Sequence, residues 1–299
     1  MITYRGFTKV YDGRAVVDRL SLTVPAGAVV ALLGPNGSGK TTTIKAAAGL
    51  IRPDAGTVQI GAGQQPATDA RARQTCSFLP QRVSFPDALT GREVVEFYRR
   101  LRGAPRDAAA RVLKFASLNG ASAKPVSTYS GGMVQRLGLA VATIAATDVL
   151  LLDEPTAALD PDGLCAFYGL IEERRRTGAA TFFSSHQLGD IERLADRVAV
   201  IVGGKLVAEL SERDIAARLA DRGVMRVRLQ ARGTGLLERV RQHSSKALWL
   251  GDELIVPGAA AMRPAVLDVI RSAGGTITGL TASEGRLDEF YRDLVGGVS

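Results

Sequence analysis

Hydrophobic positions along the chain change their period several times, and these changes predict strands that alternate with helices. Apolar runs and two-residue alternation predict strands over 2–4, 20–24, 28–33, 56–60, 149–152, 180–184 and 198–202. Apolar residues at helical spacing predict helices over 42–50, within 90–118, and over 132–146, 164–176 and 188–195. Fully apolar strands between helices are typical of a parallel sheet that is covered on both faces. The pattern therefore predicts an α/β fold into which a helical block of about 82–146 is inserted.

The pattern changes after residue 212, where shorter strands and helices follow one another. Strands are predicted over 224–230, 247–250, 254–256 and 276–280, and helices over 236–242, 264–272 and 286–294. We therefore expect a first domain over 1–212 and a small α+β domain over 213–299. The second domain shows no recognisable spacing of catalytic residues, and it does not repeat the first domain.

The apolar run over 28–33 leads directly into a stretch that fits the phosphate-binding pattern G-x-x-x-x-G-K-[ST]. The stretch consists of Gly34, Pro35, Asn36, Gly37, Ser38, Gly39, Lys40, Thr41 and Thr42. Glycines allow the backbone to turn its N–H groups toward phosphate oxygens, and the helix that follows adds partial positive charge. We expect Lys40 to reach the β- and γ-phosphates of a nucleoside triphosphate and the Thr41 hydroxyl to bind Mg²⁺. A plain glycine-rich turn is the weaker interpretation, because both flanks fit a phosphate-binding loop.

Two carboxylates, Asp153 and Glu154, follow the apolar strand over 149–152. Ligands of parallel sheets bind at the carboxyl ends of the strands, so this pair is expected beside the phosphate-binding loop. We expect Asp153 to hold Mg²⁺, directly or through water, and Glu154 to act as the general base toward the attacking water. An acidic pair after a strand is a weak signal of a catalytic site when it occurs alone. The phosphate-binding loop upstream makes this interpretation stronger.

Two further polar residues are candidates for the same edge of the sheet. His186 follows the strand over 180–184, and we expect it to contact the γ-phosphate rather than to be a satisfied structural histidine. Gln81 precedes the helical block and is a candidate sensor of Mg²⁺ or the γ-phosphate. Its spacing alone does not distinguish this sensing role from a structural one.

Ser130, Gly131 and Gly132 lie where the helix over 132–146 is expected to begin, and a serine with two glycines there makes a second anion-binding helix start. One chain rarely needs two such sites for one triphosphate. The second site therefore indicates the nucleotide of a partner copy, which requires a dimer. The alternative is an N-cap followed by a glycine turn.

Composition narrows the class of partner. The net charge is +8, and the segment 71–114 holds ten Arg and Lys residues against four acidic ones, whereas 212–299 is close to balanced. Aromatic and basic residues do not interleave as they do in single-strand binders, so we expect no nucleic-acid partner. A basic face toward an anionic membrane surface fits the local charge, and a solvated arginine-rich helix face is the alternative.

Cysteine usage and apolar run lengths bear on location. Cys76 and Cys165 are too few for a disulfide framework, so we expect a reducing compartment. No apolar run reaches the ~18–20 residues that span a bilayer. We therefore expect a soluble chain whose membrane role comes through a partner.

Together these residues resemble the nucleotide-binding subunit of an ATP-binding cassette (ABC) transporter, with motifs in the right order over about 2–212. The resemblance implies an adenine-stacking Tyr11, a Walker A loop at 34–42, a Q-loop Gln81, a signature motif at Ser130, Gly131 and Gly132, Asp153 at the end of Walker B, the catalytic Glu154, a D-loop Asp160 and a switch His186. The sequence departs from the usual signature LSGGQ, because Tyr129 and Met133 occupy its first and last positions. This departure puts the rate of the cycle and the partner contacts in question.

The resemblance also implies an architecture and a mechanism. The expected fold is a P-loop NTPase core with an inserted helical subdomain and a C-terminal α+β appendage. Two copies would pair head to tail as a homodimer, and each would place ATP and Mg²⁺ between its Walker A loop and the signature motif of its partner. The helical subdomain would contact an integral-membrane subunit, which places the chain peripherally on the cytoplasmic face of the inner membrane.

Several stretches resemble particular subfamilies. The run Leu287–Tyr291 is similar to the end of ABC-2-type exporter ATPases, whereas Leu89–Glu93 and Tyr129–Ala140 are similar to the Nos-type ATPase. The second resemblance implies a role in copper delivery for nitrous oxide reductase maturation, with a periplasmic copper-binding protein as a further partner. The chain itself has no Cys, His or Met cluster suited to copper.

Three alternatives stay open beside that role. One is an ABC-2 exporter of drugs, antibiotics or lipids. Another is a soluble ABC ATPase of translation or DNA repair, which usually carries two cassettes, a coiled coil or zinc insertions that are not visible here. An inactive binding module is the third, and the intact Lys40, Asp153, Glu154 and His186 argue against it.

Overall fold

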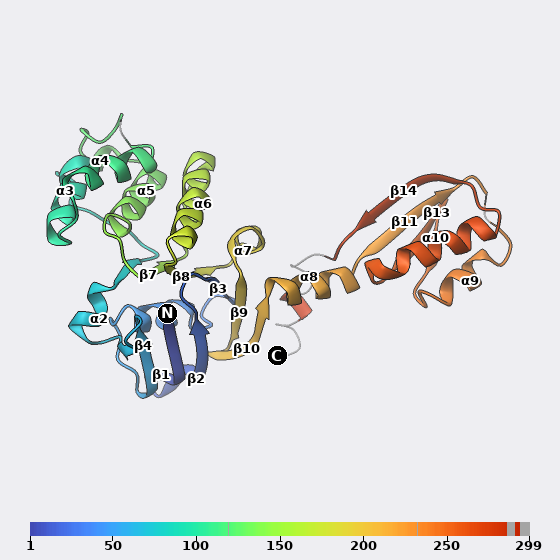
Figure 1. Ribbon diagram of the computed structural model, residues 1–299, viewed down its shortest axis with the longest axis horizontal. Helices are drawn as coiled ribbons and strands as arrows, with labels where there is room; N and C mark the ends of the chain where they lie inside the picture. Colours follow the sequence, from blue (N-terminus) through green and yellow to red (C-terminus); the bar gives the residue numbers. More distant parts are fainter. Residues whose placement is uncertain (119, 232, 286–290, 294–299) are drawn as a thin grey trace. The chain divides into compact units, whose positions relative to one another are not determined.

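The computed structural model describes residues 1–118, 120–231, 233–285 and 291–293. Its contacts divide the chain into two compact units, Met1–Glu209 and Leu210–Ser299 (Figure 1). The boundary falls inside strand β10 (Lys205–Ser211), close to residue 212, where the sequence pattern changes.

A six-stranded sheet forms the centre of the first unit. In spatial order its strands are β10, β9 (Arg197–Val202), β3 (Val29–Leu33), β8 (Ala180–Ser185), β7 (Val149–Asp153) and β6 (Cys76–Leu79). From β9 to β6 all neighbours pair in parallel, and β3, β7 and β8 are entirely buried. The register pairs Leu33 with Ser185 and Asp153 with Ser184, so the carboxyl ends of these three strands meet at one edge.

A second, antiparallel sheet packs near the N-terminus, in the order β2, β1, β4, β5. Its strands are β1 (Ile2–Tyr11), β2 (Arg14–Val24), β4 (Ala55–Ile60) and β5 (Gln65–Pro66). Asp12 and Gly13 make the turn between β1 and β2, both with positive φ. Helix α1 (Lys40–Ala47) joins this sheet to the parallel one, because Tyr4 donates to the Thr43 carbonyl at 2.9 Å and packs with Ile44 and Phe182 in one core.

The expected helical block lies between β6 and β7 and comprises α3 (Gly91–Leu101), α4 (Arg106–Phe115), a short 3₁₀ turn (Val126–Thr128) and α5 (Gly131–Ala142) (Figure 1). Thr90 and Glu93 form a reciprocal capping box at the start of α3. The helices bury their own small core around Val95, Leu113 and Leu137. The short α2 (Ala70–Gln74) precedes β6, whereas α6 (Pro161–Arg176) and α7 (Leu188–Leu194) follow β7 and β8.

The second unit is a four-stranded sheet, ordered β12, β13, β11, β14, with α9 and α10 packed against it. Its elements are α8 (Glu212–Asp221), β11 (Val224–Leu229), α9 (Leu236–Arg241), β12 (Leu248–Leu250), β13 (Glu253–Pro257), a 3₁₀ turn (Ala260–Met262), α10 (Arg263–Ser272) and β14 (Ile277–Ser283). Met225 and Val227 alternate with exposed arginines and pack toward Val240 and Ile270. The helix expected over 286–294 and the exporter-like stretch Leu287–Tyr291 lie outside the described residues, apart from 291–293.

Candidate functional site

The loop between β3 and α1 is shaped by glycines that no other residue could replace without movement. A Cβ atom on Gly34 would collide with the carbonyl oxygen of Ile201 and with the Ser38 side chain. Gly39 has a φ of 101°, and its Cβ would lie 2.7 Å from the carbonyl oxygen of Val16. The loop is therefore held by its own unit in a closely packed, left-handed path that suits backbone contact with phosphate.

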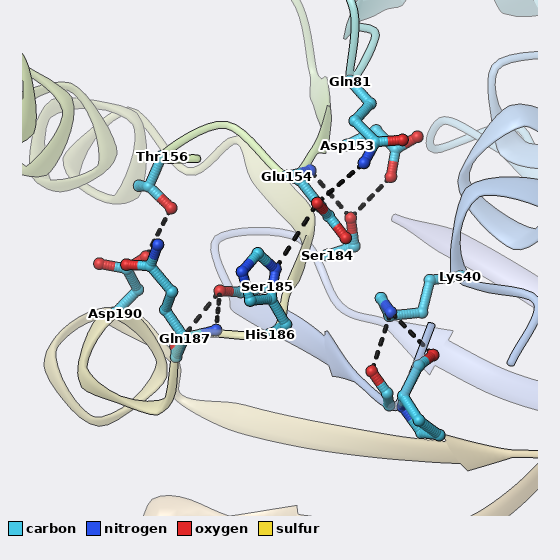
Figure 2. A network of polar contacts seen from close by, with 12 residues as sticks. Lys40, Gln81, Asp153, Glu154, Thr156, Ser184, Ser185, His186, Gln187 and Asp190 are labelled. Atoms are coloured by element: carbon cyan, nitrogen blue, oxygen red, sulfur yellow. Dashed lines mark hydrogen bonds and ion pairs between the residues drawn. The ribbon is translucent and has the colours of Figure 1, made fainter. Parts of the chain in front are cut away.

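Lys40 is the cation of this loop and is only 5% exposed. Its ammonium donates to the carbonyl oxygens of Gly34 at 2.8 Å and Pro35 at 3.1 Å, so the side chain folds back across the loop (Figure 2). Burial lowers the pKa of this ammonium, and the charges of Glu154 and Asp153 oppose the shift. Lys40 and the two carboxylates therefore share one electrostatic site. Pro35, Thr41 and Thr42 are partly buried, whereas Asn36 and Gly37 are exposed.

Asp153 is entirely buried at the end of β7. Its Oδ1 accepts a hydrogen bond from the Ser184 hydroxyl at 2.7 Å, and among the described residues its Oδ2 and the Ser38 hydroxyl have no hydrogen-bond partner. A buried carboxylate oxygen without a partner is costly unless a ligand completes it. Oxygen donors of this kind are those that Mg²⁺ prefers, so the residues present fit a magnesium ion.

Glu154 stands next to Asp153 in a strained backbone conformation, with a φ of 48°. Its N–H donates to the Ser184 hydroxyl at 2.9 Å, which holds the residue against β8. The carboxylate Oε2 accepts from the Gln81 amide at 2.9 Å and lies 3.5 Å from His186 Nδ1 (Figure 2). Gln81, Glu154 and His186 thus come together after the ends of the three neighbouring strands β6, β7 and β8, although the strand before Gln81 was not predicted from the sequence.

The segment after Glu154 is fixed by side chains that the sequence analysis did not single out. The Gln135 amide donates to the Pro155 carbonyl at 3.1 Å, and the Thr156 hydroxyl donates to Asp190 at 2.6 Å. Gln135 and Asp190 are 5% and 4% exposed. A polar residue on the otherwise apolar face of a helix was the signal that could have revealed both.

Ser130 caps α5 by accepting a hydrogen bond from the Met133 N–H at 3.3 Å. A Cβ on Gly132 would lie 3.0 Å from the Ala158 carbonyl oxygen, whereas one on Gly131 would meet nothing within 4 Å. Asp160 caps α6 through the Gly163 N–H at 2.9 Å and lies 3.5 Å from Arg136. The start of α5 is therefore beside the 154–160 loop, and no hydrogen bond or ion pair in the described part of the chain joins it to the 34–42 loop.

The two unusual signature residues pack inside the helical block. The Tyr129 hydroxyl donates to the Ala121 carbonyl at 2.9 Å, and a Cβ on Gly91 would collide with that hydroxyl. Met133 packs partly buried against the core of the block. Tyr11, by contrast, is 43% exposed at the end of β1, with the Lys9 ammonium 5.3 Å from its ring centroid. Its ring is therefore accessible for stacking.

Comparison with known proteins identifies the family to which this chain belongs. A family model described as "ABC transporter" matches residues 17–157. A daunorubicin/doxorubicin resistance ATP-binding protein of Streptomyces peucetius is 36% identical over 228 residues, which cover 75% of this chain and 69% of the relative. The chain belongs to the ABC transporter ATP-binding proteins.

Other relatives of this ABC ATPase agree. A Nod factor export ATP-binding protein of Burkholderia lata is 38% identical, covering 70% of each chain. A linearmycin resistance ATP-binding protein of Bacillus subtilis is 27% identical, covering 81% of this chain and 79% of its own. Among solved structures, an ATP-binding subunit of an ABC transporter superposes with a TM-score of 0.67 at 25% identity, covering 73% of this chain and 92% of that one. A dimeric bacterial ABC transporter cassette gives 0.66 at 25% identity, covering 71% and 99%.

These similarities confirm the expected P-loop NTPase fold and make the chain an ATPase. ABC ATPase domains form dimers and work with a membrane subunit. In the part of this chain that the structure describes, every helix is too short or too polar to cross a bilayer.

Proposed function

We propose that this ABC ATPase drives the export of an amphiphilic small molecule through a separate membrane subunit. The observation that carries the proposal is the set of relatives, which are named for resistance to daunorubicin and doxorubicin, for resistance to linearmycin and for Nod factor export. Two of them are at least 36% identical over more than two thirds of their length. Copper delivery to nitrous oxide reductase, with a periplasmic copper-binding partner, rests only on Leu89–Glu93 and Tyr129–Ala140, and none of these relatives is named for copper.

The site supports a role for each polar residue in hydrolysis. Glu154 is the proposed general base, because its carboxylate is held between Gln81 and His186 at the end of β7. His186 is 50% exposed on its side chain and is the proposed γ-phosphate contact. Lys40 exchanges its two carbonyl partners for phosphate oxygens when ATP binds, a charge-assisted contact.

Magnesium binding is proposed at Asp153, Thr41 and Gln81. The unpaired Oδ2 of Asp153 supplies an oxygen, and the Gln81 amide nitrogen is engaged with Glu154, which leaves its carbonyl oxygen as an acceptor. When bound, Mg²⁺ supplies charge neutralisation at the β- and γ-phosphates. Asp153 itself is kept in place by Ser184, so the same hydroxyl orients both carboxylate residues.

Dimerisation is proposed to complete the site. Ser130 caps a twelve-residue helix that begins with Gly131 and Gly132, and the first N–H groups of a helix lack intrahelical partners. They are accessible at the start of α5, and Asp160 lies beside them. A head-to-tail homodimer would place these donors on the triphosphate held by the 34–42 loop and Tyr11 of the other copy.

The membrane subunit is proposed to dock on the helical block. A cavity of about 290 Å³ lies between β6 and the block, lined by Phe78, Tyr98, Leu101 and Val141 among others. Phe97 and Leu101 on α3 are 59% and 66% exposed, which makes an apolar surface beside the cavity. This surface would receive a short segment of the partner and hold the chain on the cytoplasmic face of the inner membrane.

A resistance assay tests the proposed cargo. The chain and its membrane subunit are expressed in a drug-sensitive host, with Glu154→Gln as the matched control, and growth is measured against anthracyclines and linear polyenes. We expect higher tolerance with the wild type and none with the variant. Unchanged tolerance, together with loss of nitrous oxide reduction in a deletion strain, would favour the copper role instead.

A further inference from the structure

A buried hydrogen-bonded bridge connects two segments that carry the proposed catalytic residues. Asp190, on α7, accepts a hydrogen bond from Thr156 at 2.6 Å on one carboxylate oxygen (Figure 2). Its other oxygen accepts from the Tyr168 hydroxyl of α6 at 2.8 Å. Asp190 and Thr156 are 4% and 6% exposed, so water does not compete for this contact.

The chemistry of the bridge is unusual for a buried carboxylate. Within the described ranges no basic side chain forms an ion pair with Asp190, and both of its donors are neutral hydroxyls. Burial, and then the hydrogen bond and charge of Asp190, raise the pKa of Tyr168, so that this hydroxyl stays protonated and keeps donating. The nearby Arg193 guanidinium lies 4.2 Å from the centroid of the Tyr168 ring, so a cation borders the bridge without an ion pair to the carboxylate.

The bridge closes a ring through the proposed catalytic pair. Thr156 lies two residues after Glu154, and Asp190 lies four residues after His186. The ring is completed by the 3.5 Å approach of His186 Nδ1 to the Glu154 carboxylate. His186 is half exposed, so its own packing does not fix this separation, whereas Glu154 is held by the Ser184 hydroxyl and the Gln81 amide.

We propose that Asp190 is a positioning residue, which acts through Thr156 to hold His186 and Glu154 in register for hydrolysis. The inference rests on the roles proposed above for Glu154 and His186, and it is independent of the exported cargo. Releasing the bridge lets the two segments shift relative to each other, and small misplacements at a reacting centre cost large factors in rate.

The test compares hydroxyl deletions on either side of one strand. Thr156→Val removes the bridge after the end of β7, and Thr147→Val is the matched control before its start. Thr147 is 8% exposed, and its hydroxyl donates to Ser77 at 3.2 Å, so both variants lose a buried threonine hydroxyl. Thermal unfolding and the kcat and KM for Mg·ATP are measured on the full chain, with Asp190→Asn and the conservative Thr156→Ser alongside.

We expect Thr156→Val and Asp190→Asn to lower kcat about ten-fold while KM changes less than two-fold, and Thr156→Ser to restore most of kcat. Thr147→Val should lower the unfolding temperature like Thr156→Val but keep kcat within two-fold of the wild type. Equal kcat losses in the two valine variants, or a change confined to KM, would overturn the proposal.

A double-mutant cycle separates positioning from a general loss of stability. In a His186→Ala background, single-turnover hydrolysis should show no further loss from Thr156→Val, because the pair to be aligned is already gone. Multiplicative losses would overturn the proposal. If Glu154→Gln and His186→Ala both keep wild-type turnover, the catalytic roles themselves fail, and the positioning role fails with them. If those two variants are inactive and Thr156→Val is fully active, only the positioning role fails.

Discussion

Two helix starts carry glycine motifs in this chain, and the structure builds them in opposite ways. At α1, the loop 34–42 is packed against β2 and β9, so that Gly34 and Gly39 admit no side chain. At α5, Ser130 and Gly131 are exposed, and Gly131 has open space around it. The contrast fits the proposed roles, in which the first start is a phosphate pocket finished within one chain. The second start would be a surface that another molecule covers before its N–H groups bind an anion.

The largest effect is expected at the finished pocket. Lys40→Ala removes a buried cation that donates to two carbonyl oxygens of the loop, so the affinity for ATP should fall about a hundred-fold or more. Titration with a fluorescent ATP analogue checks this on the isolated chain. An affinity within three-fold of the wild type would mean that the loop is not the primary site.

Alanine at one glycine of each motif gives a matched pair for stability. Gly34→Ala forces a methyl group into the Ile201 carbonyl and should cost about 2 kcal/mol of unfolding free energy. Gly131→Ala meets no atom within 4 Å and should leave stability unchanged or slightly higher. Chemical denaturation of both variants measures the difference, and equal losses would remove the contrast.

A substitution at the exposed start of α5 should lower the turnover of ATP and leave the affinity for ATP unchanged. Ser130→Asp keeps a good N-cap but places negative charge where the partner's triphosphate is proposed to lie. We expect ATP affinity of the isolated chain within two-fold and a turnover about ten-fold lower. In a Glu154→Gln background, size-exclusion chromatography with ATP should show a dimer that Ser130→Asp abolishes. A dimer that persists would place the partner contact elsewhere.

A substitution of Tyr11 tests nucleotide binding at the 34–42 loop, and we expect it to have a smaller effect on ATP affinity. Its exposed ring is proposed to stack on adenine, so Tyr11→Ala should weaken ATP about three- to ten-fold, whereas Tyr11→Phe should not. The same nucleotide titration applies. Equal affinities of wild type and Tyr11→Ala would return Tyr11 to a surface role.

The smallest effect is a pH dependence of Lys40. Because burial lowers its pKa below the ordinary 10.5, the folded chain binds this proton less firmly than the unfolded chain. The penalty is complete below the lowered pKa and fades as pH rises toward 10.5, so stability relative to Lys40→Met should increase over that window. Denaturation of both proteins across the alkaline range measures it, and a constant difference would contradict it.

Much of the architecture and the candidate site could be predicted from the sequence, because both depend on local patterns of apolar and polar residues. The apolar runs ending at Leu33 and Asp153 are fully buried strands, and parallel pairing brings their ends to one edge. This rule alone places Lys40, Glu154 and His186 together. Element ends were less accurate: α1 begins at Lys40 rather than Thr42, since the helix starts directly after the left-handed Gly39.

What could not be predicted depends on contacts between distant segments. Strand β6 has only four residues, one of them a serine, and β10 is largely half-exposed, so neither shows a clear period. Helix α8 was not predicted, although Ile215 and Leu219 lie at helical spacing, and the helix buries none of its residues. The partners of Gln135 and Asp190 are 20 and 34 residues away in sequence, a distance at which no motif specifies pairing.

Tyr129 and Gly91 have a consequence for exchanging parts between relatives. The Tyr129 phenol occupies the volume that any side chain at position 91 would need. The tyrosine therefore fits only because residue 91 is a glycine. A chimaera that imports a leucine at 129 by itself leaves a hollow, and one that imports a larger residue at 91 by itself has a steric conflict. Positions 91 and 129 should therefore be exchanged together when the motif is transplanted. In proteins that descend from this chain, we expect the two positions to be substituted together.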